Sequence, residues 1–313
     1  MKKFEIDYVK RQACPVCSFP ADGATSVGEM QTENYLFKKY YIPSHAPSER
    51  TSVLYCCGCG VYYKDYVPEP VSLSRLFESS IGNVWNKSYD YNNEIQIAKA
   101  LFPGIMPDVL DVGASNGELL RRFSPFCSRL SALDVVKNPE CERYVTGEYI
   151  TGWLEDESLR WSWQPYDLVT LFDVVEHLYH ADKSFANLKK LVKQGGYVLV
   201  ETGDAESFLP RRYGQNNWWY INRIEHHLAF TRASIEHIAA KFGFSVAFFQ
   251  RKRHKYIDTL SASRIAAMLA MSFAYRTYPS GYLKLMRRVF RKPIVQPRNV
   301  IENDHLLIAL KRS

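Results

Sequence analysis

The stretch that decides the fold is residues 107–120, which read PDVLDVGASNGELL. A short apolar run, a glycine-rich turn and a helix start follow one another here, which is typical of a β-loop-α unit whose loop lets a ligand approach the backbone closely. The apolar run ends at Asp111, and the loop has the pattern Asp-x-Gly-x-x-x-Gly. A carboxylate at this position would repel a phosphate but suits the amino group of an aminoacyl moiety, so the pattern does not favour a dinucleotide.

Two downstream segments supply further strands. A strand over 129–134 ends in Asp134, about 20 residues past the glycine loop, where a carboxylate can accept both hydroxyls of a ribose. Residues 149–156 (YITGWLED) end a third strand, and residues 166–178 (YDLVTLFDVVEHL) indicate a buried strand that runs into a loop.

The rest of the chain continues the alternation of helices and strands. We expect a helix over 183–192 and a strand over 196–201 as a further αβ unit. A helix over 231–242 begins at a threonine cap and is ended by a glycine, and a strand over 244–250 follows it. Residues 304–310 (DHLLIAL) predict the last strand.

The glycine loop resembles motif I of the class I S-adenosylmethionine-dependent methyltransferases, and the later segments agree with that family in order and distance over about 89–250 plus the last strand. The resemblance implies an α/β fold with a Rossmann-like seven-stranded sheet, helices on both faces and an antiparallel final strand. It implies S-adenosyl-L-methionine as the cofactor, held by Asp111, Gly113, Ala114, Ser115, Gly117, Asp134, Trp153, Leu154, Phe172, Asp173, Val174 and Tyr89. For Trp153, packing in the core is the alternative to stacking on the adenine.

Histidines are the candidate general bases, because only histidine titrates near neutrality without a perturbed pKa. A family branch that acts on sugars and small metabolites has a segment similar to 224–231 (IEHHLAFT), and this resemblance favours His227 as the base, with His226 beside it. His177 belongs to the fourth motif, where positioning the cofactor is its alternative role.

Five of the seven cysteines lie within the first 59 residues. Two Cys-x-x-Cys pairs among them form two turns that can present four thiolates to one zinc ion. We expect the ligands to be Cys14, Cys17, Cys56 and Cys59, with Cys57 in place of Cys56 as the alternative. Because all four positions would be filled by sulfur, the zinc is expected to be structural.

The charge of the chain is uneven. Residues 251–313 hold 14 Lys or Arg against 3 Asp or Glu, whereas the overall net charge is only +7. Two helices joined at 279–281 are expected in this basic segment. A lid, a homodimer contact, a peripheral contact of 251–292 with an anionic membrane, or a grip on an anionic substrate would each use them.

We therefore expect an N-terminal zinc-binding region over 1–75, a methyltransferase core over 76–250, a basic helical insertion over 251–300 and a last core strand over 301–313. No run reaches the roughly 18 to 20 apolar residues of a membrane span, and residues 1–17 lack the apolar stretch of a secretory signal. These features predict a cytoplasmic location, with attachment to the membrane periphery as the alternative.

The predicted function is methyl transfer to an oxygen of a saccharide or small metabolite, with a histidine general base. The loop over 172–175 (FDVV) lacks the prolines of the Asn/Asp-Pro-Pro-Tyr/Phe loop that grips nucleobase amines, so nucleic acid is a disfavoured acceptor. Methylation of a carbon in a nucleotide-linked keto sugar is one alternative. A non-catalytic RNA-binding module with a degenerate core is another, and the intact Asp111, Gly113, Gly117 and Asp134 argue against it.

Overall fold

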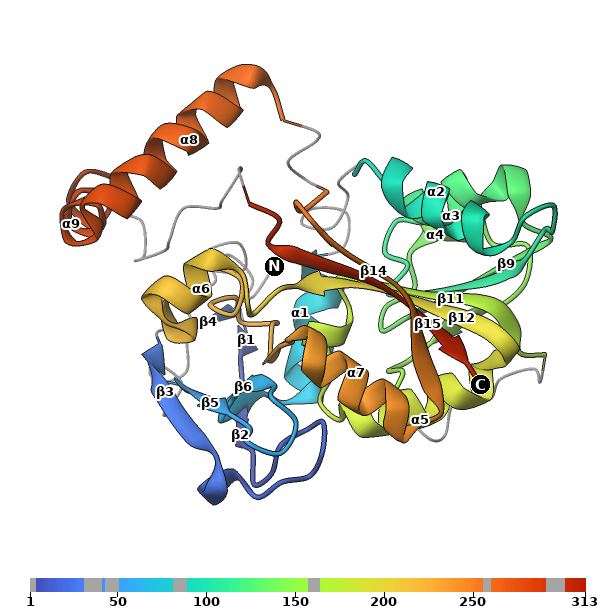
Figure 1. Cartoon of the computed structure of the whole chain (residues 1–313), viewed down its shortest axis with the longest axis horizontal. Coiled ribbons are helices and arrows are strands. Elements are labelled where there is room, and N and C mark those ends of the chain that lie inside the picture. The colour runs from blue at the N-terminus through green and yellow to red at the C-terminus, as the bar shows by residue number, and fades with distance from the viewer. Residues whose placement is uncertain are drawn as a thin grey trace.

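The computed structural model describes residues 4–30, 41–42, 51–80, 89–156, 164–255, 260–290 and 302–313. A seven-stranded sheet forms its centre (Figure 1). In spatial order its strands are β10 (Tyr149–Thr151), β9 (Arg129–Asp134), β8 (Asp108–Val112), β11 (Tyr166–Phe172), β12 (Val192–Gly203), β15 (His305–Arg312) and β14 (Phe244–Lys252). Only β15 is antiparallel to its neighbours, so the predicted seven strands and the reversed last strand are confirmed.

Helices cover both faces of this sheet, as predicted (Figure 1). One face carries α2 (Asn92–Leu101), α3 (Glu118–Phe123) and α4 (Pro139–Glu142), while the other carries α5 (Ala181–Leu191) and α7 (Arg232–Lys241). The central strand β11 is buried at all but one of its positions, because helices on both faces exclude water from a parallel sheet. Thr231 begins α7 with a capping box, in which its hydroxyl accepts the backbone N–H of Ser234 (3.0 Å).

The N-terminal segments form small sheets beside this core. β3 (Thr25–Met30), β5 (Thr51–Tyr55) and β6 (Tyr62–Lys64) make a sheet whose fourth strand is β13 (Leu228–Ala229), contributed by the core. β2 (Tyr8–Lys10) pairs with β7 (Tyr66–Pro68), and β1 (Phe4–Glu5) pairs with β4 (Tyr41–Ile42). The helix α1 (Pro70–Ser80) runs across the predicted boundary at residue 75.

Short elements complete the connections. They are the 3₁₀ turns η1 (Ala21–Gly23), η3 (Ser124–Phe126), η4 (Val175–His177) and η5 (Gln215–Asn217) and the helix α6 (Phe208–Tyr213). The turn η4 and the strand β13 are important below because they place the histidines.

Two helices precede the last strand, as expected from the sequence. They are α8 (Ala262–Thr277) and α9 (Pro279–Phe290), and they project away from the sheet (Figure 1). Tyr275 and Tyr282 join them to Leu209 of α6 in a small apolar cluster. Phe273 is 68% exposed, and residues 256–259 and 291–300 of the predicted insertion lie outside the described residues. Among the described helices, none has both the length and the apolar character that crossing a bilayer requires.

Candidate active site

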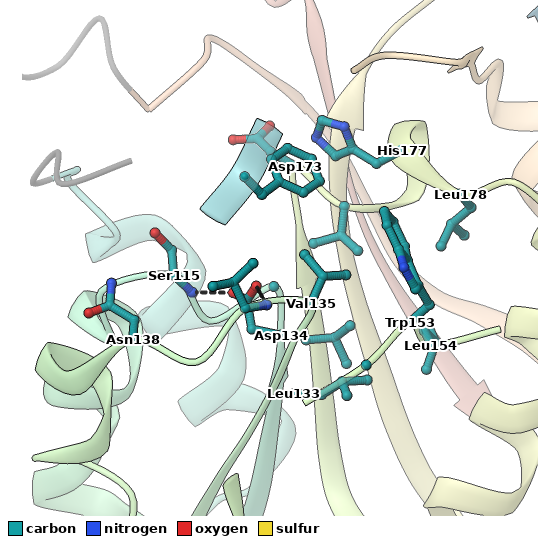
Figure 2. Close-up of a pocket in the computed structure, with 16 residues that line it drawn as sticks. Ser115, Leu133, Asp134, Val135, Asn138, Trp153, Leu154, Asp173, His177 and Leu178 are labelled. Atoms are coloured by element: carbon teal, nitrogen blue, oxygen red, sulfur yellow. Dashed lines mark hydrogen bonds between the residues drawn. The ribbon is translucent and has the colours of Figure 1, made fainter. Parts of the chain in front are cut away.

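A pocket opens at the carboxyl ends of β8, β9, β10 and β11, where the chain crosses from β10 on one side of β8 to β11 on the other (Figure 2). It is lined by Phe77, Val112, Gly113, Ser115, Leu133, Asp134, Val135, Val136, Asn138, Gly152, Trp153, Leu154, Asp173, Val174, His177 and Leu178. A neighbouring hollow is lined by Tyr89, Tyr91, Asp111, Gly113, Ala114, Ser115, Asn116, Glu118, Leu119 and Phe172. Of the predicted cofactor residues, only Gly117, the N-cap of α3, lines neither hollow.

The glycine loop requires its glycines for conformation and for space. Gly113 and Gly117 have φ angles of +74° and +76°, a backbone region that side chains rarely adopt. A Cβ on Gly113 would lie 2.6 Å from Cγ2 of Val174, and one on Gly117 would lie 2.8 Å from the Cα of Cys141. The loop therefore passes close to neighbouring chain segments and leaves its backbone accessible to a ligand.

Asp134 is held at the end of β9 by the glycine loop. Its Oδ2 accepts the backbone N–H of Ser115 (2.8 Å), as Figure 2 shows, and its Oδ1 accepts that of Val136 (3.2 Å). Each carboxylate oxygen keeps a second lone pair, which can accept a hydroxyl. Burial raises the pKa of Asp134, although the backbone donors oppose this effect. The arrangement fits the ribose-binding role predicted from the sequence.

Asp111 is 4% exposed and accepts a hydrogen bond from the Thr170 hydroxyl (2.7 Å). Burial raises its pKa to about 7, and the charge of Asp134 adds to this rise. A buried carboxylate of this kind is stabilised by a cation, so it fits the ammonium group of a bound amino acid moiety.

Apolar side chains form the opposite wall of the pocket. Trp153 lines the pocket and also packs against Tyr179, with ring centroids 5.6 Å apart, so the same ring faces the pocket and takes part in core packing. Phe77 of α1 adds a second ring, 6.3 Å from that of Trp153. Phe77 was not predicted as a pocket residue. Its only signal in the sequence is the amphipathic spacing of a helix that lies largely within the predicted N-terminal zinc-binding region.

His177 lies on the pocket wall beside Asp173 and Leu178 (Figure 2). Its Nδ1 is 2.7 Å from the backbone carbonyl oxygen of Glu225. Because a carbonyl oxygen only accepts, Nδ1 carries the proton of the neutral ring and Nε2 keeps its lone pair. This tautomer can accept a proton at Nε2.

The other two histidines occupy buried positions and line neither hollow. His227 has no exposed surface, and its ring packs 4.6 Å from that of Tyr179. Its backbone N–H donates to the carbonyl of Glu176 (2.7 Å), and its carbonyl accepts the N–H of Lys64 (3.0 Å). Burial lowers the pKa of both His226 and His227 well below the usual range, which favours their neutral forms.

A network of largely buried lysines and carboxylates, which was not predicted from the sequence, lies next to the pocket. Lys255 is 1% exposed, and its Nζ lies 2.7 Å from Oδ2 of Asp173 and 3.5 Å from Oε1 of Glu201. Burial acts to lower the pKa of Lys255, but the two carboxylates outweigh it and hold the pKa well above the usual range. Lys252 lies 3.6 Å from the same Glu201 oxygen and contacts Glu94.

These lysines were counted with the basic segment after residue 250, but they belong to the core. Residues 251–255 (RKRHK) include the end of β14 and the three residues that follow it. They lie at the carboxyl edge of the sheet, where Lys255 contacts Asp173. The Nζ of Lys255 lies 5.5 Å from the ring centroids of Tyr89 and Tyr91, which cover it on the side of the second hollow. The only local sign of this network in the sequence is a pair of lysines, Lys252 and Lys255, which are three residues apart at the end of a strand.

The four predicted zinc ligands come together in the N-terminal region. Sγ of Cys14 lies 3.6 Å from that of Cys59, and Sγ of Cys17 lies 3.4 Å from that of Cys56, close to the separation of about 3.8 Å in a tetrahedral zinc–thiolate site. All four sulfurs lie within 4.8 Å of one another. Cys57 is exposed outside the cluster, so the geometry fits Cys56 rather than Cys57 as the fourth ligand.

Comparison with known proteins gives a consistent result. Residues 86–247, more than half of the chain, match a family model described as a methyltransferase domain. A ubiquinone biosynthesis O-methyltransferase from Proteus mirabilis is 30% identical over 101 residues, which are 30% of this chain and 41% of the relative. The corresponding protein from Vibrio atlanticus is 32% identical over 101 residues, 30% of this chain and 42% of the relative. The chain thus matches less than half the length of either relative.

A solved structure is similar over a longer span. The 1,6-didemethyltoxoflavin-N1-methyltransferase of Burkholderia thailandensis, crystallised with 1,6-didemethyltoxoflavin and S-adenosylhomocysteine, has a TM-score of 0.52 and 15% sequence identity. The similarity covers 84% of this chain and 96% of that protein. At this level of identity it shows a shared fold.

Proposed function

Because the chain belongs to the class I S-adenosylmethionine-dependent methyltransferases, we propose that it transfers a methyl group to an oxygen of a saccharide or other small metabolite, with His177 as the general base. The names of both curated relatives support oxygen as the accepting atom. The observation that carries the proposal is the neutral His177 tautomer, with its Nε2 acceptor on the pocket wall. Family membership also favours an enzyme over the RNA-binding alternative.

The pocket residues fit the cofactor in chemistry and placement. Asp134 would accept the ribose hydroxyls, Trp153 and Leu154 would contact the adenine, and Asp111 would face the ammonium group. When bound, the cofactor supplies an electrophilic methyl group. Asp111 and the glycine loop orient the amino acid end, while the apolar wall with Phe77 excludes water from the other end.

His177 is supported as the base by the groups around it. The Glu225 carbonyl holds Nδ1–H, so a proton taken from the acceptor hydroxyl would arrive at Nε2. The carboxylates of Glu176 and Glu225 are buried nearby and would stabilise the resulting imidazolium. His227 was the preferred base from sequence, but its ring packs beneath Tyr179 and lines neither hollow, so its position favours it less.

The test compares two histidine variants in methyl transfer from labelled cofactor to a panel of hydroxyl metabolites and saccharides. His177→Gln should keep cofactor affinity, measured by calorimetry, while turnover falls roughly 10²- to 10⁴-fold. His237→Ala is the matched control, because His237 is exposed on α7. Undiminished turnover in His177→Gln, or a loss confined to His227→Gln, would contradict the assignment. Nuclear magnetic resonance of the product distinguishes oxygen from carbon methylation.

We also propose that Cys14, Cys17, Cys56 and Cys59 hold a structural zinc ion. The sulfur separations support this, and Cys14, Cys56 and Cys59 share one apolar cluster with Leu154 and Leu178 of the pocket. Purified protein should contain about one zinc per chain. Cys56→Ser should lose the metal, whereas the neighbouring Cys57→Ser should retain it. Equal zinc content in the two variants would refute this ligand set.

A further inference from the structure

A second group of metal-ligand side chains lies outside the cysteine cluster. Asp173 follows β11, His254 follows β14, and His305 begins β15, so three separate strand ends meet here. One ligand atom from each lies within 4.8 Å of the others. His254 Nε2 is 3.4 Å from Asp173 Oδ2, and the centroids of the two imidazole rings are 4.5 Å apart.

Two ligand atoms in this group are buried without a hydrogen-bond partner in the described part of the chain. They are Nε2 of His305, a residue with no exposed surface, and Oδ1 of Asp173. Leaving a buried polar atom unsatisfied costs about 1–3 kcal/mol, so such atoms usually have a ligand or a functional role. Both of these atoms belong to the same three-residue group.

Neighbouring side chains hydrogen-bond to His305 and Asp173 in the way that neighbours of metal ligands commonly do. Nδ1 of His305 lies 2.8 Å from Oδ1 of Asp304, so Nδ1–H donates to a carboxylate, and in the neutral ring Nε2 keeps its lone pair. Nζ of Lys255 donates to Oδ2 of Asp173 (2.7 Å), which leaves Oδ1 available. Carboxylate-bound histidines and hydrogen-bonded carboxylates are the usual surroundings of bound metals.

The charge around the group is unbalanced. Two ammonium groups, those of Lys252 and Lys255, meet four carboxylates, those of Glu94, Glu201, Asp173 and Asp304. With neutral imidazoles and four ionised carboxyl groups, this network carries an excess of two negative charges; Glu94 and Glu201 are fully buried, whereas the Asp173 side chain is 26% exposed. A divalent cation would neutralise the excess.

We propose that Asp173, His254 and His305 bind one divalent transition-metal ion, with Asp304 and Lys255 as positioning residues. Two imidazoles and one carboxylate suit Mn²⁺, Fe²⁺, Co²⁺, Ni²⁺ or Zn²⁺, rather than Ca²⁺ or Mg²⁺, which prefer oxygen ligands. Three protein ligands leave coordination positions open for water or substrate oxygen.

Of the three proposed ligands, Asp173 connects the site to the pocket. Asp173 lines the same pocket as His177, and Figure 2 shows both at one end of it. The following role rests on the proposed function. The metal would bind the oxygen atoms of an acceptor and lower the pKa of the bound hydroxyl. Acceptors with two adjacent oxygens would then be preferred.

The test uses the full chain with its zinc content measured, and it needs neither cofactor nor acceptor. Mn²⁺ is titrated into the protein, and free Mn²⁺ is followed by electron paramagnetic resonance. We expect one Mn²⁺ site per chain, at least about 100-fold weaker in His305→Ala and roughly 10- to 100-fold weaker in the positioning variant Asp304→Asn. His237→Ala, which removes an exposed histidine, should bind as the parent does.

Two results would overturn the proposal. One is no Mn²⁺ or Co²⁺ binding by folded protein at millimolar metal, which would leave protonation of His305 as the source of balancing charge. The other is unchanged affinity in both His305→Ala and Asp304→Asn. If His305→Ala fails to fold, as thermal unfolding would show, Asp304→Asn decides alone. A negative result in the Mn²⁺ titration does not change the result of the cofactor titration or of the His177→Gln test. The metal-site proposal can therefore be refuted independently of the proposed function.

Discussion

Replacing Asp111 by asparagine should stabilise the ligand-free protein at alkaline pH while abolishing its cofactor affinity. Asp111 is 4% exposed, and burial raises its pKa to about 7 from an ordinary 3.8. A carboxyl whose pKa is raised by folding holds its proton more tightly in the folded state. Its contribution to stability is therefore fully present below pH 3.8 and is lost as the pH rises to about 7. Asparagine does not titrate, so the variant avoids this loss.

The magnitude follows from the width of this pH window. Each unit of pKa shift corresponds to about 1.4 kcal/mol, so between pH 5 and pH 8 the parent should lose about 2–3 kcal/mol relative to Asp111→Asn. The amide oxygen of asparagine can still accept the Thr170 hydroxyl (2.7 Å in the parent), so packing is little changed at pH 5, where Asp111 is protonated. Of the two pH values compared, pH 5 should show the smaller difference in stability between the two proteins.

The assay is equilibrium unfolding in urea at pH 5 and pH 8, without cofactor, followed by tryptophan fluorescence and circular dichroism. Asp22→Asn is the matched control, since Asp22 is exposed and its replacement should change stability by less than about 0.5 kcal/mol at either pH. A difference between Asp111→Asn and parent that is the same at both pH values would refute the reasoning. Retained cofactor affinity in the variant would refute the role of Asp111 as the ammonium partner.

Three further predictions concern other parts of the structure. Lys255→Met should lower the free energy of unfolding by about 3–5 kcal/mol, because it leaves the Asp173 carboxylate without its closest cation, and urea unfolding at pH 7 would show this. Gly113→Ala should weaken S-adenosylhomocysteine binding in calorimetry, because the new Cβ would lie 2.6 Å from Val174 and the φ of +74° disfavours alanine; unchanged affinity would contradict the account of the loop. Phe273→Ser should change stability by less than about 0.5 kcal/mol, because Phe273 is 68% exposed on α8, and a larger loss in thermal unfolding would show an unrecognised contact.

The core of the fold was predictable because its signals are local. The apolar run, the glycines at 113 and 117 and the acid at 134 lie close together in the sequence, and each reflects a backbone or packing requirement of one β-loop-α unit. The Cys-x-x-Cys pairs are equally local, and two such turns need only approach each other to form a cluster. Element ends differed by a few residues, as for β12, which runs from Val192 to Gly203 rather than over 196–201.

The roles of the histidines depended on side-chain burial, which the sequence does not contain. From the sequence, the resemblance of residues 224–231 to a family segment favoured His227 as the base, and His177 had positioning of the cofactor as its alternative role. Only the packed structure shows that β6 pairs with β13 and that His227 points beneath Tyr179, while the ring of His177 reaches the pocket wall. The position of Phe77 in the same wall likewise depends on how α1 packs against the core.

The sequence by itself therefore determined the methyltransferase sheet, its cofactor loop and a set of four clustered cysteines, because these depend on short-range patterns of shape and polarity. The tertiary structure alone decided which ionisable groups meet. Glu94, Asp173, Glu201, Lys255 and His305 come from five distant segments, and the antiparallel insertion of β15 between β12 and β14 brings them together. Such a network leaves no local pattern, because the charge of each member is balanced by partners that are close in space and far apart along the chain.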